Sequence, residues 1–189
     1  MYLRKYLPVN NRKREACCYQ PYFDLRRNIA KVIANYAIGA VQKNILLDIF
    51  VDHETPNYFQ GDLTSLLGLL SELFKHSIES LEEGEICIRI NHESPHKNNN
   101  CETELSIIIT THNATGTKNL PQVDQFSQLC NDSDKNEALK SYATYLRIQH
   151  LCSYFSGNIK KQKLDDRKTQ YTVSLILQQA DSSRMLYLA

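Results

Sequence analysis

The sequence predicts an α/β (α+β) two-layer sandwich in which a mixed, mostly antiparallel sheet of about five strands carries three main helices on one face. Three amphipathic helical stretches begin near Asp24, Asp62 and Glu137, and each needs a buried apolar surface. Short alternating or β-branched stretches between them are typical of strands. At 189 residues the chain suits one domain, which can bury about two thirds of its unfolded surface without disulfides or metals.

Charge separates a basic N-terminal region from the rest of the chain. Residues 1–43 contain nine Lys or Arg and two acidic residues, a net charge of +7, whereas the remainder contains 13 and 19, a net charge of −6. Residues 1–20 show no periodicity, so we expect a basic arm at 1–20, a domain at 21–179 and a tail at 180–189.

Both ends of the chain are candidate partner-binding segments. Arg12, Lys13 and Arg14 would attract an acidic protein, an anionic membrane surface or nucleic acid, or would simply form a solvated basic tail. Leu186 and Tyr187 lie in an apolar C-terminal stretch that either packs back on the domain or binds a partner. We expect protein partners, and nucleic acid is the less favoured ligand.

The remaining composition indicates a soluble, cytoplasmic protein. The six cysteines form no C-x-x-C pair and lack the spacing of a zinc site or a disulfide framework, which favours reduced thiols. The first 30 residues are too charged for a signal peptide, and no apolar run approaches the roughly 18 residues that span a bilayer.

The first predicted helix and strand follow the arm. Apolar residues recur on one helical face from Asp24 to Gln42, with Asp24 as the N-cap. The stretch NILLDIFV at 44–51 is short and rich in β-branched residues, so it predicts a strand.

The second predicted helix runs from Asp62 into a strand. Its apolar stripe contains Leu63, Leu66, Leu67, Leu70, Phe74, Ile78 and Leu81. Asp62 is the expected N-cap, and Gly84 is placed to end the helix in the left-handed conformation. Glu72, His76 and Glu79 fall on the opposite, polar side, and Glu72 and His76 lie one turn apart. Ile86, Ile88 and Ile90 then alternate as in a strand with one buried face.

Alternation and helical periodicity define the C-terminal half. Leu105, Ile107 and Ile109 alternate after a polar connection and predict a hairpin partner for the preceding strand. A third helix is expected over 137–155, and two strands at 158–164 and 169–177 flank a turn. The predicted buried side of the third helix contains Leu139, Tyr142, Ala143, Leu146, Tyr154 and Phe155.

The stretch GDLTSLLGLLSELFKHSIESLEEGEI resembles the ATP- and magnesium-binding segment of bacterial sensor histidine kinases, which have the GHKL (Bergerat) ATPase fold. The resemblance runs from about Tyr22 to Gln178. It places Glu72 at the first position of the box and His76 where the family has a magnesium-chelating Asn. The resemblance also covers the family's Asp-x-Gly-x-Gly box, with His112 at the adenine-binding Asp and Ala114 and Gly116 at the two glycines.

The resemblance implies the fold, whereas the residues depart from the family's nucleotide chemistry. From Lys118 to Ser156 there is no glycine to let backbone N–H groups wrap a triphosphate, and Tyr142 to Tyr145 stands about where those glycines would be. Imidazole at His76 also suits magnesium poorly. We therefore expect a non-catalytic scaffold or regulatory module without a cofactor. The alternative is a catalytic domain that retains weak binding of ATP with magnesium, or phosphotransfer.

Overall fold

The computed structural model describes residues 22–93, 102–114 and 132–180, and the structural statements below refer to these residues. Seven strands form one mixed sheet in the order β1-β3-β7-β5-β4-β2, and β6 pairs with β7. The strands are β1 (Tyr22–Asp24), β2 (Ile45–Val51), β3 (Tyr58–Gln60), β4 (Gly84–Glu93), β5 (Glu102–Asn113), β6 (Asn158–Lys163) and β7 (Lys168–Gln179). The helices are α1 (Leu25–Gln42), α2 (Leu63–Glu79) and α3 (Asp132–Tyr154).

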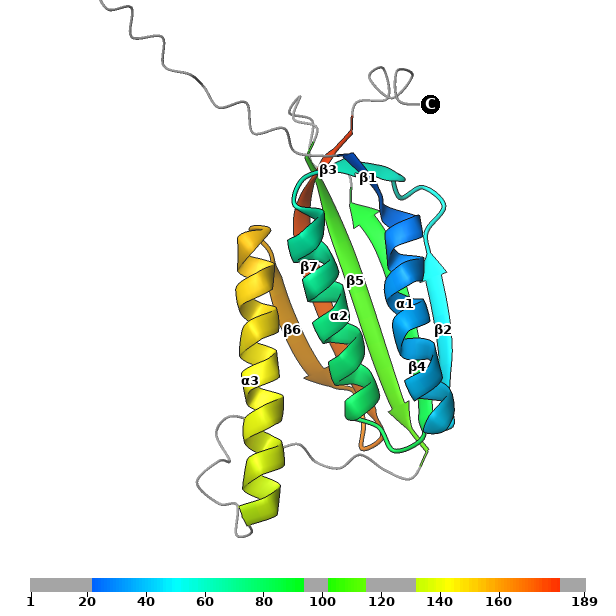
Figure 1. The fold of residues 1–189 in the computed structure, drawn as a ribbon, viewed down its shortest axis with the longest axis vertical. Coiled ribbons are helices and arrows are strands. Elements are labelled where there is room, and N and C mark those ends of the chain that lie inside the picture. Colours follow the sequence, from blue (N-terminus) through cyan, green and yellow to red (C-terminus); the bar gives the residue numbers. More distant parts are fainter. Residues whose placement is uncertain (1–21, 94–101, 115–131, 181–189) are drawn as a thin grey trace, which may run out of the picture.

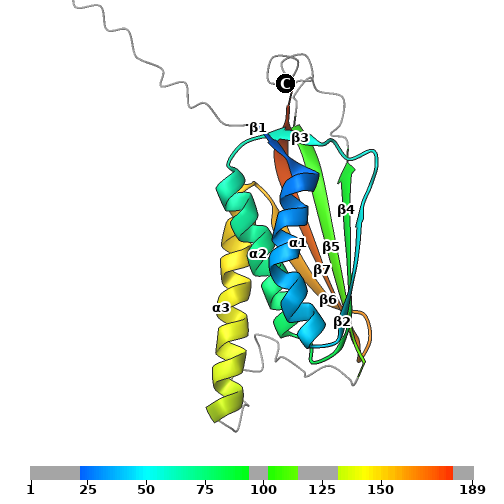
Figure 2. The same cartoon turned by 45° about the vertical axis from the view of Figure 1, so that its right-hand side comes forward.

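The three helices lie side by side on one face of the sheet, in the order α3, α2, α1 (Figures 1 and 2). Among the described strands, β2 and β4 pair in parallel, and the other pairs are antiparallel. The predicted two-layer sandwich with three helices on one face is therefore confirmed. The sheet has two strands more than expected because β1 and β3 contain three residues each, too few to show a strand period.

Aspartate side chains begin the first two helices, as predicted. The Asp24 Oδ1 atom accepts a hydrogen bond of 2.8 Å from the Arg27 backbone N–H. Asp62 accepts from the Ser65 backbone N–H at 3.1 Å and from the Ser65 hydroxyl at 2.6 Å. These bonds satisfy N–H groups that lack a partner within the helix.

Gly84 has a different role from the predicted one. α2 already ends at Glu79, with Ser80 as its C-cap, and Gly84 is the first residue of β4, with a φ of 136°. The predicted helix-ending glycine was therefore wrong, because the chain closes α2 without a left-handed residue and needs the positive φ only when it enters the sheet.

The core lies between the sheet and the helix layer. Ile86, Ile88 and Ile90 of β4 are fully buried, as their alternation predicted. From α2, Leu66, Leu70 and Phe74 pack against the same core. None of the helices within the described ranges is long and apolar enough to cross a membrane.

The face of α3 that the structure buries differs from the predicted one. Thr144, Ile148 and Cys152 are buried, whereas Leu139, Leu146 and Tyr154 are exposed and only Phe155 of the predicted set is buried. α3 lies at the end of the helix layer and packs on α2, β6 and β7, so its buried stripe is narrow. The predicted buried face of α3 was therefore wrong, because the most apolar side of this helix is not the side that packs on α2 and the sheet.

Candidate functional site

His76 lies at the centre of a polar cluster between the helix layer and the sheet. Its side chain, on α2, is 6% exposed. The Nε2 atom lies 3.1 Å from the hydroxyl oxygen of Tyr171 on β7, and the two rings meet edge to face at 79°. The predicted position of His76 on a polar outer side was wrong. α2 lies between α1 and α3, with the sheet behind it in Figure 1, so little of its surface remains for solvent.

The environment keeps the His76 ring neutral at physiological pH. Burial, and secondarily the positive charge of Lys161, lower the pKa of His76 from 6.5 to about 4. Burial also raises the pKa of Tyr171, with a smaller contribution from Tyr145 on α3, so the Tyr171 hydroxyl keeps its proton. A neutral imidazole and a neutral phenol therefore share one buried hydrogen bond.

Lys161 and Tyr145 complete the surroundings of Tyr171. The Lys161 ammonium, on β6, lies 5.7 Å from the centre of the Tyr171 ring, within the range of a cation–π contact. Partial desolvation lowers the pKa of Lys161, although its side chain as a whole is exposed. Tyr145 packs against the core, and burial raises its pKa as well. Side chains from α2, α3, β6 and β7 thus meet at one place.

Glu72, one turn before His76, connects α2 to α3. Its Oε2 atom lies 3.6 Å from a guanidinium nitrogen of Arg147, which also donates a 3.2 Å hydrogen bond to the Thr144 hydroxyl. The Glu72 oxygen is buried and has no hydrogen-bond partner, so the ion pair with Arg147 is its main compensation. A half-exposed ion pair contributes little to stability, but it occupies the carboxylate of Glu72.

His112 belongs to the other side of the sheet. Thr111 and Asn113 are 3% and 1% exposed and face the helices, so His112 between them faces away from His76. Ala114 follows at the end of β5, where its backbone N–H donates to the Glu83 carbonyl at 3.3 Å. The structure thus brings Glu72 and His76 together on α2 but does not bring His112 to them.

Two residues of this region were missed in the sequence. Tyr171 is 95 positions from His76, and nothing local in the sequence pairs them. Asn113 could have been found, because the alternation of Leu105, Ile107 and Ile109 continues to Thr111 and Asn113 and places them on the buried face.

The other predicted site residues lie outside the described ranges. These are Arg12, Lys13 and Arg14 of the arm, Gly116, and Leu186 and Tyr187 of the tail. Among the residues that the structure does describe, no group of three or more His, Cys, Asp or Glu side chains is placed to hold a metal ion.

Solved structures of histidine kinases share this fold. Acinetobacter baumannii histidine kinase AdeS matches with a TM-score of 0.54 at 12% identity, over 86% of this chain and 69% of that one. The catalytic domain of histidine kinase ThkA matches with a TM-score of 0.53 at 16% identity, over 82% and 94%. Full-length ShkA in complex with AMPPNP matches with a TM-score of 0.55 at 11% identity, over 86% and 32%.

Comparisons of the sequence itself found no match. No protein-family model matches the chain, and no curated protein matches its sequence. The structural matches therefore show a histidine-kinase-type fold, and at such low identity they show the fold alone.

Proposed function

We propose that this chain, which has the fold of a histidine-kinase catalytic domain, is a non-catalytic protein-interaction module that does not bind ATP with magnesium. The observation that carries the proposal is the state of His76. By the resemblance of α2 to the kinase segment, His76 occupies the position of a magnesium-chelating Asn. Here the side chain is buried and neutral, and Tyr171 already uses its Nε2 atom.

The ring at this position is poorly suited to magnesium on chemical grounds. Magnesium prefers oxygen ligands in near-octahedral geometry. Turning His76 toward a metal would also break the bond to Tyr171 and leave a buried hydroxyl unpaired, at a cost of about 1 to 3 kcal/mol. Both effects oppose metal binding on this face of α2.

The contact between α2 and α3 supports the same conclusion. Glu72, the first position of the box in the resemblance, is paired with Arg147 of α3. Tyr145 of the same helix packs beside Tyr171. Since residues 118–156 contain no glycine, the chain also lacks the sequence that lets backbone N–H groups surround a triphosphate.

The alternative function is an ATP-binding catalytic domain of a sensor histidine kinase. The shared fold favours it, and ShkA was solved in complex with AMPPNP. Thermal unfolding of the full chain with and without ATP–magnesium separates the two functions. At about 5 mM nucleotide, a site with a dissociation constant of about 10 μM would stabilise the folded state by roughly 4 kcal/mol.

We expect no change in melting temperature, with an active histidine-kinase catalytic domain as the positive control. Saturable stabilisation of this chain by ATP–magnesium, absent with magnesium alone, would overturn the proposal.

The arm and the tail are the expected contacts for protein partners. Reversing the charges of Arg12, Lys13 and Arg14 should slow association, because attraction between unlike charges speeds encounter. Replacing Leu186 and Tyr187 with Ala should instead speed dissociation, because buried apolar contacts limit release. Binding kinetics on a partner recovered with the full chain would test both effects. Unchanged rates in both variants would place the interaction surface elsewhere.

A further inference from the structure

Within the described residues, β2 is an edge strand whose outer side is unpaired. It is last in the strand order and pairs only with β4, in parallel, through all seven residues from Ile45 to Val51 (Figure 1). Among the described residues, no strand pairs with its other side. A free strand edge offers a row of backbone N–H and C=O groups to any extended chain.

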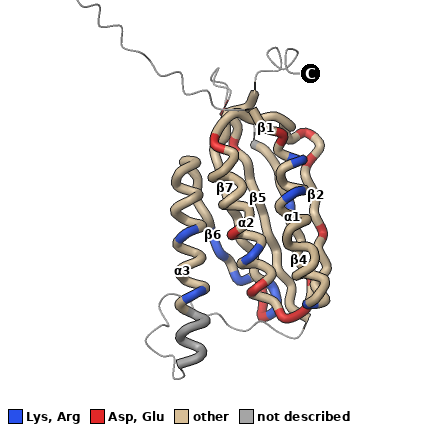
Figure 3. The backbone as a smooth tube through the Cα atoms, viewed as in Figure 1, with Lys and Arg blue, Asp and Glu red and all other residues tan. Residues whose placement is uncertain are grey.

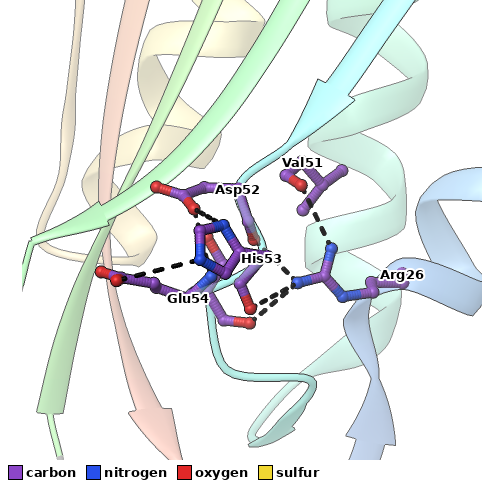
Figure 4. Close-up of polar contacts among 6 residues, drawn as sticks. Arg26, Val51, Asp52, His53 and Glu54 are labelled. Carbon is purple, nitrogen blue, oxygen red and sulfur yellow. Dashed lines mark hydrogen bonds and ion pairs between the residues drawn. The ribbon is translucent and has the colours of Figure 1, made fainter.

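The Arg26 side chain covers the C-terminal end of this edge. Arg26 of α1 donates to the carbonyl of Val51 at 3.4 Å and to those of Asp52 and Thr55 at 2.7 and 3.1 Å (Figure 4). The guanidinium thus holds the loop after β2 against α1. Within the described part of the chain, the open edge therefore covers Ile45 to Phe50.

The side chains of β2 protect this edge less than those of β6 protect theirs. Leu46 and Phe50 are 72% and 55% exposed on the face away from the helices, with Asp48 between them. By contrast, β6, which also lies at an edge of the sheet, carries Lys160, Lys161 and Lys163 in six residues (Figure 3). Lysines on an edge strand discourage pairing with another chain, so β6 is better protected than β2, whose one charged side chain is Asp48.

Charge indicates what the edge can bind. Asp48 is the only charged residue of β2. In the neighbouring strand, Glu85 lies opposite Leu46 and Arg89 lies opposite Phe50, so their charges offset each other, and Asp48 lies between them. A strand added here would find apolar contacts at Leu46 and Phe50 and a negative charge between them.

We propose that the edge of β2 binds an extended segment of a partner protein by strand addition, with a Lys or Arg of that segment beside Asp48 and apolar residues two positions to either side. Backbone hydrogen bonds would supply much of the affinity, and the alternating side chains would supply specificity. This proposal rests on the protein-interaction function proposed above and specifies which residues the partner segment should contain. It does not depend on the loss of nucleotide binding.

A second copy of this chain fits the edge less well. Two β2 strands paired antiparallel about Asp48 would place the two carboxylates directly opposite each other, which destabilises a cross-strand pair. A basic residue of a different polypeptide at that place would instead be attracted to the Asp48 carboxylate.

Amide NMR spectra of the full chain, titrated with a capped peptide of sequence Thr-Leu-Thr-Lys-Thr-Leu-Thr, test the proposal. We expect saturable shifts centred on the β2 amides. A peptide with Glu in place of Lys should bind about two- to fivefold more weakly, the range for one cross-strand charge pair. Asp48→Lys should reverse this preference, and Leu46→Lys with Phe50→Lys should abolish binding. These three side chains are exposed, so the variants should keep the fold.

Several outcomes would overturn the proposal. One is the absence of shifts on β2 at millimolar peptide, and another is an unchanged preference in Asp48→Lys. Dimerisation of the chain that the Leu46→Lys, Phe50→Lys variant abolishes would assign the edge to a second copy. Faster hydrogen exchange of β2 after deletion of residues 1–21 would assign it to the chain's own arm. None of these outcomes bears on ATP binding, so the two proposals fail separately.

Discussion

Gly84→Ala should destabilise the domain by at least about 2 to 4 kcal/mol, because the backbone there has no room for a side chain. Gly84 has a φ of 136°, and an added Cβ would lie 2.0 Å from the carbonyl oxygen of His112 on the adjacent strand. That oxygen belongs to the β4–β5 ladder, so it cannot move without breaking strand pairing.

Gly68→Ala is the matched control. Nothing lies within 4 Å of a Cβ added at Gly68, which is inside α2. Alanine should stabilise the helix there by about 0.5 to 1 kcal/mol. Urea unfolding of both variants measures the two effects. Equal stability of the two variants would contradict the lack of room for a side chain where the chain enters β4.

The stability of the domain should depend on pH through His76. Its pKa is about 4 in the folded state and 6.5 ordinarily, so between these values the unfolded state binds more protons. The stabilisation from a neutral His76 is therefore fully present above pH 6.5 and is lost as pH falls toward 4. The difference of 2.5 units between the two pKa values corresponds to about 3 kcal/mol.

His76→Gln isolates this contribution, because glutamine is polar and does not titrate. Carboxylates also titrate toward pH 4, so the informative quantity is the difference in urea midpoint between the two proteins at each pH. We expect the wild-type protein to lose stability more steeply than the variant between pH 6.5 and 4. Parallel curves would show that His76 is not held neutral by its surroundings.

The layer arrangement could be predicted because its signals are local. The caps at Asp24 and Asp62 and the alternation of Ile86, Ile88 and Ile90 each depend on residues close together in the sequence. β1 and β3 could not be predicted, because three residues are too few to show a strand period. They form strands because β1 pairs with β3 and β3 pairs with the longer β7.

The site was harder to predict because it depends on contacts between distant elements. The polarity of His76 indicated exposure, but the packing of α3 against α2 and the hydroxyl of Tyr171 make a buried position tolerable. The buried face of α3 likewise depends on its place at the end of the layer. His112 faces away from the helices because side chains alternate between the two faces of β5. A motif match depends on spacing along the chain and does not include this alternation.

Side-chain nitrogen NMR of His76, recorded at neutral pH with and without ATP–magnesium, tests whether this ring is neutral and whether nucleotide reaches it. We expect a neutral imidazole with one hydrogen-bonded ring nitrogen, and no change in its signals up to about 5 mM nucleotide. A positively charged ring, or a saturable change in the His76 signals at micromolar ATP–magnesium, would contradict it.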